Sequence, residues 1–302
     1  MINTLSSSTD RFLADISNLS NRLIKAQRQV SSGLRMQTVS DDADQVPALL
    51  ELKAHIAHNN QLKYNLGRAQ TEVNAAEGAI STATSLMDRA RQIAAQSATN
   101  FTSDGTRQQL VSQIGDIITE MYSLTQTQVE GRFVFSGNAD QNAPYAGVDF
   151  AAPNSLGTYQ GSANTRVLEH PNGSTFSVSL TADQVFDSGA SNTSVLKALT
   201  NLRNDLATNN LNAIAVDTAD LGTSAQYLNG QQALYGDIQN KVADALTFQT
   251  QLNTQLQLQL SNLQDADETS AILEMQKDSI AQQAALQAHA ALPQKSLFDF
   301  IG

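Results

Sequence analysis

The sequence predicts a mainly α fold, in which both chain ends form a long antiparallel helical bundle or coiled coil that carries a small central β insert. Both ends of the 302-residue chain repeat apolar residues at steps of three and four, which is typical of amphipathic helices. The stretches that favour β-structure lie between these ends. Because a helix with one apolar stripe cannot bury it alone, each end is expected to need a partner helix from this chain or a neighbouring copy.

Composition narrows the range of functions. The chain has 18 basic and 29 acidic residues and a net charge of −11, which disfavours nucleic acid and anionic membranes as partners. It contains no cysteine, which excludes disulfides, thiolate metal sites and cysteine nucleophiles. His55 and His58 could share a helix face, but no third metal ligand follows at a recognisable spacing. The sequence therefore predicts no enzymatic activity, no metal and no cofactor.

Residues 1–44 are expected to form an N-terminal coiled-coil helix, over about 4–35, and a turn. The helix carries a heptad seam with one polar interruption at Thr9. The apolar positions that we assign to an assembly interface are Leu5, Phe12, Ile16, Leu19, Leu23 and Val30. This seam is expected to be buried between subunits, because the chain ends have little else to cover them.

Residues 45–130 are expected to form a helical rod with an ordinary intrachain core. One helix is predicted from about 45 to 98 and another from about 106 to 130, because their apolar residues keep a helical period. An acidic cluster at 41–44 precedes the first of these helices, and Pro47 lies early in it, where a missing N–H is tolerated.

Residues 131–192 are expected to form a β-rich domain that faces outward. Arg132–Phe135 is a short β-forming run, and Thr165–His170 and Thr175–Leu180 are predicted strands. Pro171–Ser174 separates these two strands and contains an Asn-Gly pair, which favours a hairpin turn.

Residues 193–235 are expected to form a helical return segment, and residues 236–302 a C-terminal coiled-coil helix and tail. The helical pattern is almost continuous over 210–290, with glycines at 222, 230 and 236 as weak points. Leu256–Leu260 alternates with a period of two, yet the surrounding pattern favours a helix. The interface residues predicted here are Val242, Leu252, Leu256 and Leu263 in the helix and Leu297, Phe298 and Phe300 in an apolar tail.

The N-terminus lacks the basic and apolar regions of a cleavable secretory signal. No apolar run reaches the roughly 18 residues that a membrane span needs. If the protein leaves the cell, it is therefore expected to use a route without a cleaved signal peptide.

Short motifs near both ends resemble the bacterial flagellin family. They occur in the same order as in that family, and the resemblance covers roughly residues 1–135 and 220–302. The motifs are VSSGLR at 30–35, SDDA at 40–43, YGDIQNK at 235–241, LQDAD at 263–267 and LPQKSLFDF at 292–300. Four or more such motifs in the right places are far more specific than any one alone.

The resemblance extends to a particular branch of the family. The run VEGRFVFSG at 129–137 and the pattern GTYQG at 157–161 resemble the subunit that joins the flagellar hook to the filament. The alternative is the filament subunit, flagellin itself. The sequence at 35–39 departs from the common forms of both branches.

The resemblance implies a structural subunit of the extracellular flagellum whose terminal helices fold together on assembly. The implied partners are further copies of the chain in a tubular layer, flagellin and another hook-associated protein. A cytosolic export chaperone is implied on the C-terminal helix, together with export by the flagellar type III apparatus.

Overall fold

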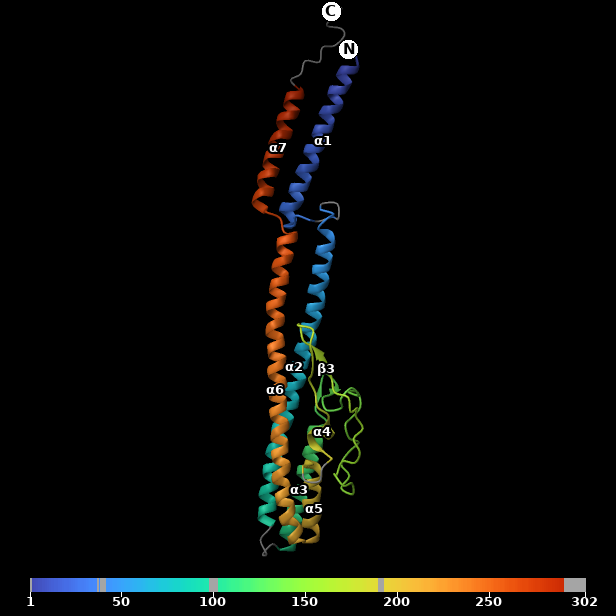
Figure 1. The fold of residues 1–302 in the computed structure, drawn as a ribbon, viewed down its shortest axis with the longest axis vertical. Coiled ribbons are helices and arrows are strands. Elements are labelled where there is room, and N and C mark those ends of the chain that lie inside the picture. The colour runs from blue at the N-terminus through green and yellow to red at the C-terminus, as the bar shows by residue number, and fades with distance from the viewer. Residues whose placement is uncertain (1, 37, 39–41, 98–102, 190–192, 291–302) are drawn as a thin grey trace, which may run out of the picture. The chain divides into compact units, whose positions relative to one another are not determined.

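The computed structural model describes residues 2–36, 38, 42–97, 103–189 and 193–290. Most of them are helical, and the strands are few and short (Figure 1). The predicted mainly α fold with a small β insert is therefore confirmed. The chain divides into two compact units, of which one combines residues 1–58 with 253–302 and the other comprises residues 59–252.

In the first unit, the two ends of the chain form a helical hairpin. Helix α1 (Ile2–Ser32) packs along helix α7 (Glu268–Ala290). Helix α1 ends at Gly33, whose φ of +71° suits glycine and whose N–H donates to the carbonyl of Gln29 at 2.9 Å. Helix α7 begins after Asp267, which accepts hydrogen bonds from both the N–H and the hydroxyl of Ser270.

Long helices build most of the second unit. Helix α2 (Val46–Ser97) and helix α6 (Leu211–Gln264) lie antiparallel, because Glu77 contacts Gln232 while Asn59 contacts Gln249. Helix α3 (Asp104–Thr125) packs against helix α5 (Val195–Thr208). Ser103 and Ser194 cap the first turns of α3 and α5 through their hydroxyl oxygens.

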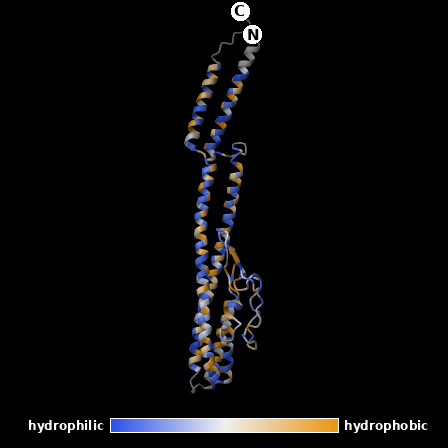
Figure 2. Ribbon diagram, in the orientation of Figure 1, coloured by the Kyte–Doolittle hydropathy of each residue, from blue (hydrophilic) through white to orange (hydrophobic). Residues whose placement is uncertain are grey.

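The core of the second unit lies between these helices, and Figure 2 shows orange residues along α3 and α5 where they meet. Apolar residues at helical spacing line each contributing face. Fully buried examples are Ile80, Met87, Ile114, Ile118, Met121, Leu199, Leu202 and Leu221. The prediction of an intrachain core for most of residues 45–130 therefore agrees with the burial of these side chains.

The β insert contains two antiparallel hairpins. Strands β1 (Gln128–Val129) and β2 (Arg132–Phe133) pair across Glu130 and Gly131, which both have positive φ. Strands β3 (Val167–Glu169) and β4 (Thr175–Ser177) form the hairpin predicted from the Asn-Gly turn. The short helix α4 (Ala182–Phe186) follows.

Aromatic packing holds the insert against the helices of its unit. The Phe135 ring meets the rings of Phe186 and Tyr235 edge-on, with centroids 5.4 and 6.5 Å apart. The Tyr235 hydroxyl also accepts a hydrogen bond from the N–H of Leu180 at 3.0 Å. The sequence prediction missed α4 and strand β1, because both are too short to show a clear period.

The stretch over 210–290 is almost continuously helical, as predicted, but its break does not lie at a glycine. Helix α6 passes through the glycines at 222, 230 and 236, and the chain leaves the helix only at 265–267. The N-capping role of Asp267 explains the break, because its carboxylate satisfies the first N–H groups of a new helix. The alternating segment Leu256–Leu260 is helical, as its surroundings predict.

Candidate assembly interface

The predicted N-terminal seam lies on the face of α1 that meets α7. Ala26 on this face is only 2% exposed. Half-buried seam residues alternate with exposed neighbours along the helix, and they are Phe12, Ile16, Leu19, Leu23 and Val30. Leu5 lies in α1, but its side chain falls outside the described residues. Within this chain, the seam is therefore covered in part by the other chain end.

Helix α7 meets this seam with a largely polar and small-residue face. Ala271 and Asp278 are its most buried positions, at 4% and 2% exposure. The Arg22 guanidinium donates to one carboxylate oxygen of Asp278 at 2.9 Å, and the other oxygen has no hydrogen-bond partner. Near the far end of the pair, the Phe12 ring stacks on His289 with centroids 4.0 Å apart. The seam on α1 is thus matched by few apolar side chains on α7.

The large apolar residues of α7 are exposed, and Leu273 and Ile280 lie on the side of the helix opposite Ala271 and Asp278. Leu273 and Ile280 are 67% and 66% exposed, while Leu286 is 51% and Ile272 is 40% exposed. Figure 2 shows orange and blue residues side by side along α7. Sequence reasoning missed this exposed face, although the seven-residue step from Leu273 to Ile280 was a signal for it.

The C-terminal seam predicted from the sequence is divided between the two units. Val242 is fully buried inside the second unit, as are Ala245 and Gln249. Leu252, Leu256 and Leu263 are half-buried. Within this chain, α1 packs on α7 rather than on this stretch, whose partner stays a prediction. The tail residues Leu297, Phe298 and Phe300 lie outside the described residues.

The two chain segments that flank the terminal hairpin are joined at Arg35. Its N–H donates to the carbonyl of Gln264 at 2.7 Å, and its guanidinium donates to the carbonyl of Leu263 at 2.9 Å. The N–H of Ala266 donates to the carbonyl of Gly33 at 2.8 Å. The two bonds from Arg35 satisfy carbonyls at the end of α6, and the bond from Ala266 satisfies the carbonyl of Gly33 just after α1.

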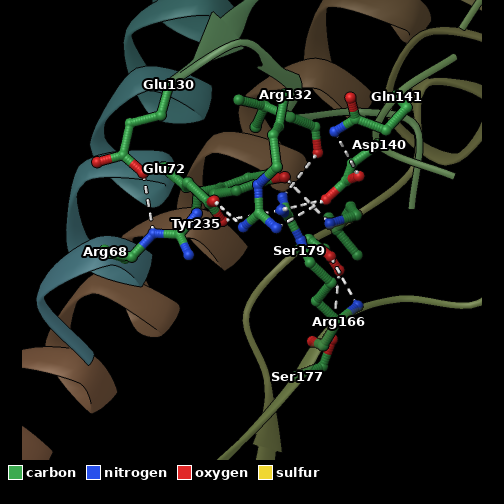
Figure 3. A network of polar contacts seen from close by, with 12 residues as sticks. Arg68, Glu72, Glu130, Arg132, Asp140, Gln141, Arg166, Ser177, Ser179 and Tyr235 are labelled. Atoms are coloured by element: carbon green, nitrogen blue, oxygen red, sulfur yellow. Dashed lines mark hydrogen bonds and ion pairs between the residues drawn. The ribbon is translucent and has the colours of Figure 1, made fainter. Parts of the chain in front are cut away.

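A network of ion pairs holds the β insert on α2 (Figure 3). Glu72 of α2 faces Arg132 and Arg166 of the insert, at 3.1 Å each. Both arginines also face Asp140, at 3.1 and 3.8 Å. The Glu72 side chain is only 8% exposed. Because the carboxylate is largely removed from water, its two arginines are needed to stabilise its charge.

A carboxylate pair links α5 and α6 close to the turn between them. Asp217 on α6 is 4% exposed. Burial, followed by the charge and hydrogen bond of Asp205 and the charge of Asp220, raises the pKa of Asp217 to about 7. The structure gives one oxygen of Asp217 no hydrogen-bond partner.

The described residues contain neither a cluster of metal ligands nor a membrane-spanning helix. Among them, no three histidine or acidic side chains are grouped closely enough to hold a metal ion. None of the helices in the described ranges is long and apolar enough to cross a bilayer.

Comparison with known proteins agrees with the resemblance seen in the terminal motifs. Residues 2–140 match the bacterial flagellin N-terminal helical region. Flagellar hook-associated protein 3 of Salmonella typhimurium is 26% identical over 309 residues, covering 91% of this chain and 90% of that protein. Flagellin of Bacillus subtilis is 24% identical over 278 residues, covering 86% of each.

Solved structures show the same fold. The flagellar hook-associated protein 3 of Legionella pneumophila superposes with a TM-score of 0.60 at 13% sequence identity, covering 70% of this chain and 98% of that one. The predicted resemblance to the flagellin family, and to hook-associated protein 3 within it, is confirmed by these comparisons.

Proposed function

We propose that this chain, which resembles the flagellin family and hook-associated protein 3 within it, is a structural subunit of the bacterial flagellum at the junction between hook and filament. The observation that carries the proposal is the similarity to a hook-associated protein 3 over about nine-tenths of both chains. The described residues fit a structural role, because the features that stand out are the half-buried seam of α1, the exposed apolar residues of α7 and the ion pairs that join separate elements.

Assembly is proposed to proceed through the terminal helices. The α1 seam, centred on Ile16 and Leu23, is only half-buried by α7, and the apolar face of α7 at Leu273 and Ile280 is exposed. Contact with neighbouring subunits would remove these side chains from water, which stabilises the assembly by roughly 25 cal/mol for each Å² of apolar surface buried. The same role is proposed for Leu252, Leu256 and Leu263 and for the tail residues Leu297, Phe298 and Phe300.

The partners follow from the same proposal. They are further copies of the chain in a short tubular layer, flagellin on one side and another hook-associated protein on the other. Export without a cleaved signal, with a cytosolic chaperone on the C-terminal helix, completes the proposal. An exposed apolar face on α7 supports the need for such a chaperone, because such faces promote aggregation before assembly.

The second candidate is flagellin itself. The similarity to Bacillus subtilis flagellin over 86% of each chain favours it, although with lower identity than the hook-associated protein 3 match. Flagellin would occupy the whole filament, whereas a junction subunit would occupy one site on each flagellum.

Immunogold labelling of intact flagella with antibody against this chain separates the two candidates. We expect one narrow band of gold where the hook meets the filament. Label along the whole filament would transfer the assignment to flagellin. Flagella that carry no label at all, in cells that express the chain, would contradict both.

A further inference from the structure

Charge is distributed very unevenly along the chain. Residues 1–40 contain five basic and two acidic residues, which leaves thirteen basic against twenty-seven acidic residues for the rest of the chain. Between residues 16 and 40 there are four basic residues and no acidic one. The second half of α1 and the segment after it are therefore positive in a strongly negative protein.

The structure gathers these basic residues around two adjoining hollows in the first unit. One hollow, of about 410 Å³, is lined by Arg22, Lys25 and Arg35, with Glu274 as its acidic lining residue. The other, of about 270 Å³, is lined by Lys25, Arg28 and Arg35. We call these two hollows the basic groove. All four basic side chains are exposed.

Carboxylates of the same chain balance the basic groove only in part. Arg22 faces Asp278 at 2.9 Å, and Arg35 faces Asp42 at 3.1 Å. Lys25 has no ion pair among the described residues, although it lines both hollows. A concave basic surface with an unpaired ammonium group favours an acidic partner.

We propose that the basic groove is a docking site for carboxylates on a second copy of this chain. The charges of the two surfaces are complementary, because the rest of every copy is acidic while the groove is basic. The groove also lies beside the α1 seam that is proposed to take part in assembly. The contact would help orient incoming subunits, because complementary charges fix register and speed encounter more than they add affinity. This inference rests on the proposed function.

Chemical cross-linking tests the contact directly. Equal amounts of isotopically heavy and light full-length protein are mixed, and a carbodiimide joins ammonium groups to carboxylates that touch them, with loss of water. We expect amide bonds between Lys25 of one copy and Asp or Glu of the other, identified by mixed heavy and light peptides. Lys25 linked only within its own chain would overturn the proposal.

A charge-reversal pair supplies the matched test. Lys25→Glu with Arg28→Glu should weaken self-association about tenfold at low salt, measured by sedimentation velocity, and the difference should shrink at high salt. The control is Lys53→Glu with Lys63→Glu, which makes the same change in net charge at exposed positions on α2. Circular dichroism is used to check that both variants remain helical.

Equal self-association of the two double variants, or none by the wild type, would overturn the docking site and leave the junction assignment intact. Binding of a short DNA duplex to the groove, without links between protein chains, would also overturn it. The junction assignment fails by a different result, namely the absence of label at the hook boundary.

Discussion

Arg22 on α1 and Asp278 on α7 form an ion pair of 2.9 Å in which the acid is almost completely buried and the base is 59% exposed. One carboxylate oxygen of Asp278 has no hydrogen-bond partner. Taking a carboxylate out of water is costly unless its partners compensate fully. The terminal hairpin therefore contains a polar contact that specifies how α7 faces α1 while contributing little stability.

The first prediction concerns this ion pair. Arg22→Ala should destabilise the α1–α7 hairpin by about 2 kcal/mol, because it leaves the Asp278 carboxylate buried and unpaired. Hydrogen exchange of α7 amides measures the effect. Arg11→Ala, at an exposed position on the same helix, should change the opening free energy derived from hydrogen exchange by less than about 0.5 kcal/mol. Equal protection in the two variants would show that the pair does not hold the hairpin.

Asp278→Leu should act in the opposite direction. Leucine removes the buried charge and adds apolar surface opposite the α1 seam. The α1–α7 hairpin should therefore become more stable by about 1–2 kcal/mol. The same hydrogen-exchange measurement applies. A loss of protection in this variant would mean that the polar contact stabilises the hairpin more than we infer.

A pH-dependent prediction follows from Asp217. Because its pKa is raised from 3.8 to about 7 in the folded protein, the unfolded chain releases this proton at lower pH than the folded chain does. Stability should therefore fall as pH rises from about 4 to about 7 and stay level above that range. Asp217→Asn should remove this dependence and stabilise the protein at pH 8 by about 2 kcal/mol.

Urea unfolding at pH 5 and pH 8 checks the Asp217 prediction. The asparagine side chain in the variant keeps the shape of the carboxylate and can donate a hydrogen bond to Asp205. Asp116→Asn, at an exposed position on α3, is the control and should leave the pH dependence unchanged. An Asp217→Asn protein that loses as much stability as the wild type between these pH values would contradict the prediction.

The docking of the β insert provides another test. Glu72→Gln should weaken the packing of the β insert on α2 by about 2–3 kcal/mol of free energy. The reason is that Arg132 and Arg166 lose the carboxylate that both of them face. Proteolysis should then cut the insert near Arg132 or Arg166 sooner than in the wild type. Glu120→Gln on the exposed side of α3 should leave the cleavage rate unchanged. Unaltered cleavage in both variants would show that aromatic packing alone holds the insert.

Much of the helical framework could be predicted from sequence, because periodic apolar residues dictate it. The bounds of α2 agree with the predicted helix over about 45–98, and the β3–β4 hairpin follows from Asn172 and Gly173. The break before α7 could not be predicted, because Asp267 acts through local hydrogen bonds that leave the helical period intact.

The candidate interface was predictable only in part. The α1 seam was visible in its heptads, but its partner was not, because helical period does not say which segment pairs with which. Glu72 lies 60 residues before Arg132, so no local pattern reveals the network that they form. The buried position of Val242 likewise depends on neighbours far away in the chain.

The last prediction addresses the exposed apolar face of α7. Ile280→Asp should leave the isolated chain folded, because this side chain is 66% exposed and touches little within its own unit. In an assembly that buries it, a carboxylate at this position would cost several kcal/mol for each subunit. We therefore expect a variant that is helical by circular dichroism yet fails to join flagella, so that cells lose motility.

The matched control for this substitution is Ala288→Asp, which adds the same charge at an exposed position about 80° around α7 from Ile280. Motility and the amount of chain recovered in purified flagella should be near wild type for Ala288→Asp and strongly reduced for Ile280→Asp. Chain secreted into the medium separates failed assembly from failed export. Normal flagella built with Ile280→Asp would mean that this face stays in water after assembly, and the interface would then have to lie on the α1 seam and the other proposed positions.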